Sequence, residues 1–256
     1  MTSRSLPPLR TLLADAALCL AFFTRLPVPL PERPRSLADA FWAASLAGLV
    51  VALLGWLAYT LAVLTGLSGG SAAALALLAT ILVTGALHED GLADTADGFG
   101  GGATSERKLE IMRDSRIGTY GALALGLSLL LRWSAIADLG SPIHVLYGLT
   151  AAHAASRALL PAYMRLTPSA RIDGLAARAG VPTSQVAASA TLIGAAALLL
   201  LGIGAALATA ICLALALVLF CRFSAVQIGG HTGDTAGALQ QIGEIITLTV
   251  AAALFY

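Results

Sequence analysis

The chain has 256 residues, of which 58% are apolar and only 11% are charged, and its formal net charge is +1. Soluble domains have about 25% charged residues, so a water-covered surface cannot be built from this composition. The composition therefore excludes an ordinary soluble enzyme, a disordered chain and a nucleic-acid-binding protein that uses a basic face.

Apolar runs long enough, or nearly long enough, to cross a bilayer dominate the chain, since a transmembrane helix needs about 20 apolar residues. They cover residues 40–67, 71–88, 118–139, 143–164, 186–202, 205–221 and 242–256. A further apolar helix, residues 11–23, contains Asp15 and ends at the prolines of 26–29, which indicates a re-entrant or interfacial helix. We therefore predict an all-α fold, a polytopic transmembrane helical bundle with about seven spans plus this N-terminal helix, in which residues 1–256 form a single domain.

Lysine and arginine are confined to alternate connections between these spans. The basic linkers are 24–39, which contains Arg25, Arg33 and Arg35, and 99–117, 165–185 and 222–241. The short connections near 68–71, 140–142 and 203 contain no Lys or Arg. Because positively charged loops stay in the cytoplasm, the four basic linkers are predicted to be cytoplasmic and the C-terminus to lie outside.

An acidic stripe follows the run 71–88, which is expected to continue without a break into it. Asp90, Asp94 and Asp97 are spaced i, i+4, i+7 and would share one helix face, whereas Glu89 points away from it. Like charges at the edge of a bilayer repel one another, so a cation is expected to neutralise them. Oxygen-only ligands favour Mg²⁺.

The stripe also permits two alternative interpretations. The helix could simply emerge into water with its carboxylates solvated, or the acids could form an ion or proton pathway in a transporter. Gly91 and Gly98 lie beside the acids and, lacking side chains, would let a ligand or a second helix approach closely.

The basic linker after the stripe is predicted to form a short helix over residues 106–116. Lys108, Arg113 and Arg116 can face the acids, with Asp114 between the two arginines. Metal-binding acids next to arginine forks suit a pyrophosphate, because the metal takes some phosphate oxygens and the guanidinium groups take others. The alternative is a basic anchor that contacts lipid phosphates.

A glycine-rich loop, residues 229–237, precedes the last helix and offers backbone N–H groups to an anion. Asp234 and Glu244 add carboxylates to this region, although a turn with a capping aspartate is an equally good interpretation. Within the spans, Arg132 needs a partner, and we expect Asp138 to provide it. Arg157 also needs a partner, and the sequence indicates none.

The segments 88–98, 109–121 and 232–235, with 23–29 near the N-terminus, together resemble the cobalamin synthase family, the adenosylcobinamide-GDP ribazoletransferases. The resemblance implies an enzyme in the bacterial inner membrane with Mg²⁺ as its metal. In the implied reaction, α-ribazole or its 5′-phosphate attacks adenosylcobinamide-GDP and GMP leaves. Adenosylcobalamin or its 5′-phosphate forms, in a late step of cobalamin biosynthesis.

The resemblance and the residue patterns together give an expected site. The expected metal ligands are Asp90, Asp94 and Asp97, and the expected catalytic residues are Asp97 and Asp234, one of which would accept the hydroxyl proton. The expected substrate-binding residues are Arg25, Lys108, Arg113, Asp114, Arg116, Thr232, Gly233 and Glu244. Glu89 and His231 depart from the family pattern and receive no role.

Expected partners are the two substrates, the lipid bilayer and other cobalamin-assembly proteins, with no nucleic acid. The active site is expected to face the cytoplasm, beside the basic linkers. Two alternative functions remain: a CDP-alcohol-type phosphotransferase, whose usual motif differs at Asp94, and a cation-coupled transporter that uses the acidic stripe as an ion site.

Overall fold

The computed structural model describes residues 8–30 and 35–255, so Arg33 lies outside the described residues. The described chain is helical and contains no strand, which confirms the predicted all-α fold. The helices are α1 (Leu9–Phe23), α2 (Leu37–Ala40), α3 (Ala44–Leu64), α4 (Gly69–Thr84), α5 (Leu87–Gly101), α6 (Ser105–Ile111), α7 (Thr119–Asp138), α8 (Pro142–Leu166), α9 (Leu175–Ala179), α10 (Ser184–Leu198), α11 (Ile203–Ile228) and α12 (Gly233–Phe255). Short 3-10 segments, η1 (Phe41–Ala43) and η2 (Leu199–Leu201), extend α2 and α10.

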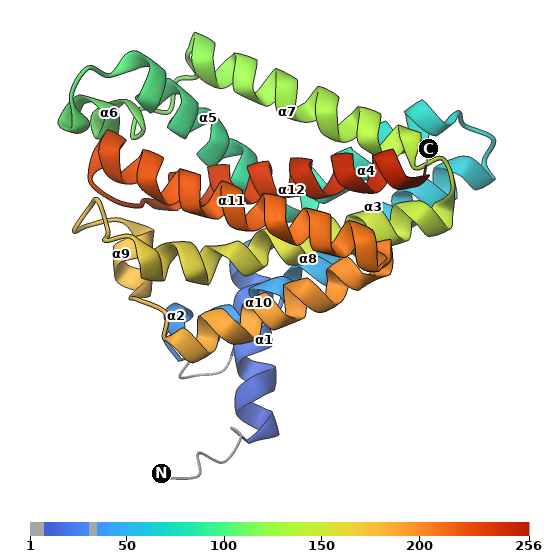
Figure 1. The fold of residues 1–256 in the computed structure, drawn as a ribbon, viewed down its shortest axis with the longest axis horizontal. Helices are drawn as coiled ribbons and strands as arrows, with labels where there is room; N and C mark the ends of the chain where they lie inside the picture. The colour runs from blue at the N-terminus through green and yellow to red at the C-terminus, as the bar shows by residue number, and fades with distance from the viewer. Residues whose placement is uncertain (1–7, 31–34, 256) are drawn as a thin grey trace.

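The bundle is built around α8, which packs against α3, α10 and α12 (Figure 1). Helix α12 in turn packs against α5, α7 and α11. Small residues line these contacts: α8 buries Gly148, Ala151 and Ala155, so neighbouring backbones approach closely. Apolar side chains such as Leu207 and Ile211 of α11 point outward, as expected for a surface that faces lipid.

Five helical segments of the described chain are long and apolar enough to cross a membrane, and six if the bent pair α4–α5 counts as one span. The predicted number of about seven spans stays a prediction, since the count depends on α8 and on the bent pair α4–α5. Helix α8 is 25 residues long but is not among the five, because His153 and Arg157 lower its hydropathy. The last helix is longer than the run 242–256 suggested, since α12 begins at Gly233, whereas α6 ends at Ile111 and is shorter than predicted.

The predicted continuity between the run 71–88 and the acidic segment is wrong. Helix α4 ends at Thr84, and α5 starts at Leu87 after a bend of 88°. Gly85 and Ala86 make the bend with φ angles of 64° and 57°. A left-handed backbone terminates a helix, and glycine tolerates it far better than alanine, so periodicity alone does not reveal this break.

The ends of the bundle differ in the way that the charge pattern predicted. The basic segments around α6, α9 and the α11–α12 connection gather at one end, on the left of Figure 1, and the uncharged α3–α4, α7–α8 and α10–α11 connections lie at the other with the C-terminus. Helix α1 runs across the direction of the long helices and projects beyond them (Figure 1). Its predicted re-entrant or interfacial position stays a prediction.

Buried charges tie four helices together in the middle of the bundle. Arg132 of α7 donates from Nη1 to Glu89 Oε1 at 2.9 Å and to Glu244 Oε1 at 3.0 Å. His153 Nδ1 of α8 lies 3.1 Å from the other oxygen of Glu244 and 3.2 Å from Arg157 Nη1. The expected pairing of Arg132 with Asp138 is wrong, because its guanidinium forms ion pairs with the buried carboxylates of Glu89 and Glu244 instead.

Arg157 gains partners that the sequence did not indicate. Its Nη1 also donates to the His153 carbonyl oxygen at 3.1 Å, and its guanidinium lies 5.9 Å from the centre of the Phe23 ring. An amide adds a further hydrogen bond to the network, since Gln240 Nε2 donates to Glu244 Oε2 at 2.7 Å. Two guanidinium groups therefore offset two carboxylates, which is the condition for keeping charges inside a bundle.

We expect Arg132→Met to lower the free energy of unfolding by about 3–5 kcal/mol, because it leaves Glu89 and Glu244 buried without their partner. The matched control is Arg107→Met, whose exposed pair with Glu110 is worth about 0–1 kcal/mol. Denaturant titration of the purified protein in detergent measures both. Equal stability of the two variants would show that the network does not hold the helices together.

Candidate active site

Helices α5 and α12 cross at two glycines. A Cβ atom on Gly91 would lie 2.7 Å from the carbonyl oxygen of Asp234, and one on Gly237 would lie 3.3 Å from Gly91 Cα and His88 Cα. A side chain at Gly91 would clash with the α12 backbone, and one at Gly237 would be tighter than an ordinary contact, so glycine at both positions allows the close crossing. The predicted close approach at Gly91 is confirmed, and the one at Gly98 is too, since Met112 and Lys108 of the α6 segment pack on it.

This crossing brings the acidic stripe of α5 to the first turn of α12. The carboxyl of Asp94 is half-buried and lies within electrostatic range of Asp90, Asp234 and Asp97, and of Arg171. Arg171 supplies positive charge: its Nη1 donates to Asp234 Oδ2 at 3.3 Å. The site is therefore a cluster of three carboxylates, Asp90, Asp94 and Asp234, beside one guanidinium; we refer to it as the acid cluster.

The sequence did not predict a role for Arg171, because arginines in cytoplasmic linkers commonly serve only to orient the protein in the membrane. Two backbone hydrogen bonds bring it to the acid cluster: His231 N donates to Pro168 O, and Ala170 N donates to His231 O, each at 2.8 Å. Gly230 permits this pairing, since a Cβ there would lie 2.1 Å from Pro168 O. The glycine-rich loop thus joins the 165–185 linker to α12.

Arg171 is held from two sides. Besides Asp234, it donates from Nη2 to the carbonyl oxygen of Leu109 at 3.0 Å. Its Nε is buried and has no hydrogen-bond partner among the described residues. An unpaired, buried guanidinium N–H beside an opening is a group that an incoming oxyanion would satisfy.

The start of α12 is organised by two threonines. Thr235 N donates to Thr232 Oγ1 at 3.2 Å and Thr232 N donates to Thr235 Oγ1 at 2.8 Å, so each hydroxyl caps the other residue's backbone. Tyr163 donates to Thr235 Oγ1 at 3.0 Å and fixes this turn to α8. The first N–H groups of a helix, here at Gly233 and Asp234, have no intrahelical acceptor and favour anions.

Asp97 shares the face of Asp90 and Asp94 but is engaged elsewhere. Its Oδ2 accepts from Gly118 N at 2.7 Å and its Oδ1 accepts from Gly121 N at 2.8 Å. Both donors lie at the start of α7, so Asp97 satisfies two of the free N–H groups there. In this structure, Asp97 is a cap for α7, and its expected metal and proton-transfer roles stay predictions.

The predicted phosphate ligands outside the acid cluster are paired with other groups. Arg113 Nη2 donates to Asp173 at 2.8 Å, Arg116 forms a 2.6 Å ion pair with Asp114, and Lys108 donates to Gln227. The hydrogen bonds from Arg116 lower the pKa of the exposed Asp114 carboxyl to about 2, so it is ionised at neutral pH. These residues lie on the α6–α7 segment, at the same end of the bundle as the acid cluster (Figure 1).

The remaining predicted substrate-binding residues separate into two groups. Thr232 and Gly233 lie at the acid cluster, beside Asp234. Glu244 lies ten residues beyond Asp234 on α12, about 15 Å away along the helix axis, inside the ion network. Arg25 lies over the bend, with its side chain packed on Gly85. Substrate binding by Glu244 and Arg25 stays a prediction.

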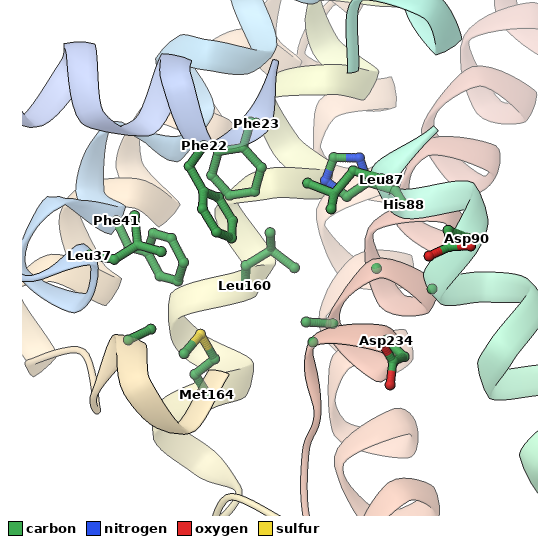
Figure 2. Close-up of a pocket in the computed structure, with 15 residues that line it drawn as sticks. Phe22, Phe23, Leu37, Phe41, Leu87, His88, Asp90, Leu160, Met164 and Asp234 are labelled. Carbon is green, nitrogen blue, oxygen red and sulfur yellow. The ribbon is translucent and has the colours of Figure 1, made fainter. Parts of the chain in front are cut away.

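Two cavities meet at Asp234 and Gly233. One, of ≈190 Å³, is largely apolar and is lined by α1, η1, α5, α8 and α12 residues, with Asp90 and Asp234 on its edge (Figure 2). The other, of ≈180 Å³, is lined by Gly233 and by the polar side chains of Ser169, Arg171, Thr232 and Asp234 among others, and we refer to it as the polar cavity. The acid cluster therefore lies between an apolar compartment and one with an arginine and a helix N-terminus.

The donor chemistry of the acid cluster fits a hard divalent cation. Within residues 8–30 and 35–255, no group of three or more His, Cys, Asp or Glu side chains is arranged to enclose a metal. Mg²⁺, however, usually binds one or two carboxylates and completes its shell with water and substrate phosphates. Because Arg171 offsets only part of the charge of three carboxylates, the cluster favours a cation that arrives with a phosphate ester.

Comparison with known proteins points in the same direction. The model of the cobalamin-5-phosphate synthase family matches residues 15–252. A Mesorhizobium japonicum protein named adenosylcobinamide-GDP ribazoletransferase is 56% identical over 94% of both chains. Proteins of the same name from Bradyrhizobium diazoefficiens and Azorhizobium caulinodans are 53% and 46% identical, over 96% and 93% of this chain and 95% and 94% of their own. No solved structure matches this chain.

These relatives decide between the functional alternatives, since all three are named as the same group-transferring enzyme. Neither a CDP-alcohol phosphotransferase nor a transporter is supported. The chain is a helical membrane protein that resembles these enzymes over nearly its whole length. It belongs to the cobalamin-5-phosphate synthase family, which acts late in cobalamin biosynthesis.

Proposed function

We propose that the acid cluster catalyses transfer of the phosphocobinamide group of adenosylcobinamide-GDP to α-ribazole or α-ribazole 5′-phosphate. The convergence of Asp90, Asp94 and Asp234 with Arg171 carries this proposal, because it combines cation-binding oxygens with a phosphate-binding guanidinium. The names of the relatives supply the substrates. A ribose hydroxyl forms a bond to the phosphorus attached to cobinamide, the bond to the bridging oxygen breaks, and GMP leaves.

The polar cavity supports a position for the pyrophosphate. Arg171 Nε would donate to a phosphate oxygen, and the N–H groups at the start of α12 would donate to another. The pairing of residues 168–170 with 230–231 holds both donors in fixed positions, so little reorganisation is needed during the reaction. Positioning of this kind supplies most of the rate in phosphoryl transfer.

Asp234 is the better candidate for the residue that accepts the hydroxyl proton. Its carboxylate borders both cavities, whereas both oxygens of Asp97 already accept backbone N–H groups. Arg171 and Thr232 each donate to Asp234 Oδ2, which orients the carboxylate. Asp90 and Asp94 would hold Mg²⁺, which when bound would neutralise charge that develops on the departing GMP.

The enzyme is proposed to lie in the bacterial inner membrane with the acid cluster facing the cytoplasm. The basic linkers at the acid-cluster end support this orientation, since cytoplasmic loops are rich in Lys and Arg. Other cobalamin-assembly proteins are proposed partners at the same surface.

We expect Asp94→Asn and Asp234→Asn each to lower kcat at least 100-fold, because each removes one cluster charge at nearly constant volume. The assay is GMP release by purified protein with Mg²⁺ and both substrates, and a chelator should abolish it. The matched control is Asp138→Asn, which changes the last residue of α7, far from the acid cluster, and should leave the rate unchanged. Full activity of the Asp94 variant would refute the proposed metal site.

Arg171→Lys should raise the KM for adenosylcobinamide-GDP about tenfold and Arg171→Ala about 100-fold, because a lysine keeps the charge but loses the guanidinium fork. The KM for α-ribazole should change much less. Arg178→Ala on the exposed side of α9 is the control. If the arginine at 171 only shields Asp234, both KM values will stay constant and kcat alone will fall.

We expect Asp97→Asn to lower the free energy of unfolding measurably and to change kcat little. An amide oxygen can replace one carboxylate oxygen as acceptor, but its NH₂ group opposes the second N–H donor of α7. Loss of the cap costs about 0.5–2 kcal/mol in thermal or denaturant unfolding. If the Mg²⁺ concentration needed for half-maximal activity stays unchanged, Asp97 has a structural role. If that concentration rises strongly, Asp97 is a metal ligand.

A further inference from the structure

The apolar cavity beside the acid cluster has no role in the proposed phosphate chemistry. Its walls include Phe22, Phe23, Phe41, Leu160 and Met164. Figure 2 shows the three phenylalanine rings gathered on one side of the cavity, with Asp90 and Asp234 on the opposite side, each on its own helix. A compartment that is aromatic at one end and acidic at the other suits a ligand with an apolar ring and a hydroxylated or charged tail.

The size of the cavity matches a small fused ring system. Its volume is ≈190 Å³, and its lining includes Asp90 and Asp234 of the acid cluster. An apolar protein cavity of about 150 Å³ accommodates benzene, so there is room here for a somewhat larger ring system but not for a corrin macrocycle. The ring would lie among the phenylalanines while its attached sugar would remain at the open edge.

The charge of the lining also selects among ligands. The described lining contains Asp90 and Asp234 but neither Lys nor Arg, so it does not suit a phosphate group. Arg171 lies instead in the polar cavity on the other side of Asp234. The two compartments therefore suit two different parts of the substrates, with the acid cluster between them.

His88 extends the aromatic wall of the cavity. It is buried and stacks on Phe23 with 5.7 Å between ring centres. Aromatic faces of this kind suit a planar ring as the ligand.

We propose that the apolar cavity binds the base of the attacking nucleoside, a planar, methylated benzimidazole, and selects it by the fit of its apolar edge. This assignment rests on the proposed function. With the base among Phe22, Phe23 and Phe41, the ribose lies at Asp90 and Asp234, where its hydroxyl meets the pyrophosphate held on the Arg171 side. Leu160 and Met164 of α8 are then specificity-determining residues.

The test compares α-ribazole with the riboside of unsubstituted benzimidazole in the wild-type protein and in variants at Leu160. Loss of the two methyl groups should raise the KM about tenfold in the wild type, since each buried methyl contributes to transfer from water. Leu160→Phe fills the cavity and should raise the KM for α-ribazole at least tenfold, while the KM for adenosylcobinamide-GDP stays within twofold. Leu160→Ala enlarges the cavity and should reduce the methyl discrimination to about threefold.

Leu159 provides the matched control, because it neighbours Leu160 on α8 but lines a different surface depression between α8, α10 and α11. Leu159→Phe and Leu159→Ala should leave both KM values and the methyl discrimination unchanged. Identical behaviour of the Leu159 and Leu160 variants would overturn the assignment. If Leu160→Phe does not fold, the Leu160→Ala measurement decides on its own.

Equilibrium dialysis of α-ribazole against the full-length protein in detergent, with and without GMP, separates this proposal from the proposed function. Binding that weakens in Leu160→Phe but not in Leu159→Phe, in a protein that releases no GMP, supports the cavity assignment and refutes the proposed function. Normal GMP release with no methyl discrimination refutes the cavity assignment alone. Absence of α-ribazole binding under both conditions also refutes it.

Discussion

Helices α5 and α12 touch backbone to backbone at Gly91 and Gly237, with no space for a side chain between them. This contact sets the position of the acidic groups at the acid cluster and in the bundle interior. On one side of the crossing it brings Asp90 and Asp94 to Asp234; on the other it brings Glu89 to the helix that bears Glu244, where Arg132 joins them. A single pair of glycines thus organises both the reactive end of the molecule and its buried charges.

The two sets of charges are stabilised by different means. In the bundle interior, two arginines compensate two carboxylates, and neighbouring amides add hydrogen bonds. At the acid cluster, three carboxylates meet one arginine, and the excess negative charge makes the cluster able to receive a cation. The interior network is balanced in charge, which suits a structural role, whereas the cluster carries excess negative charge, as expected of a site that binds a ligand.

The sequence predicts the local features well, because helical periodicity and glycine spacing depend on near neighbours. The stripe of Asp90, Asp94 and Asp97 does lie on one helix, and Gly91 and Gly98 do receive neighbouring segments. It does not predict contacts between segments far apart in the chain. The hydrogen bonds from Gly118 and Gly121 to Asp97, the pairing that brings Arg171 to Asp234, and the choice of Glu89 over Asp138 by Arg132 all depend on how helices dock. The break at Gly85 and Ala86 escaped prediction because alanine rarely adopts a left-handed conformation.

The charge pattern of α8 has a consequence for how this protein is made. His153 and Arg157 lie in the middle of that helix, and inserting such groups singly into a bilayer is costly. Glu244, the carboxylate that His153 contacts, belongs to α12, which is synthesised after α8. We therefore expect α8 to stay at the translocon or at the membrane surface, partly hydrated, until α12 supplies its counter-charge, so that insertion of α8 and its packing against α12 are coupled.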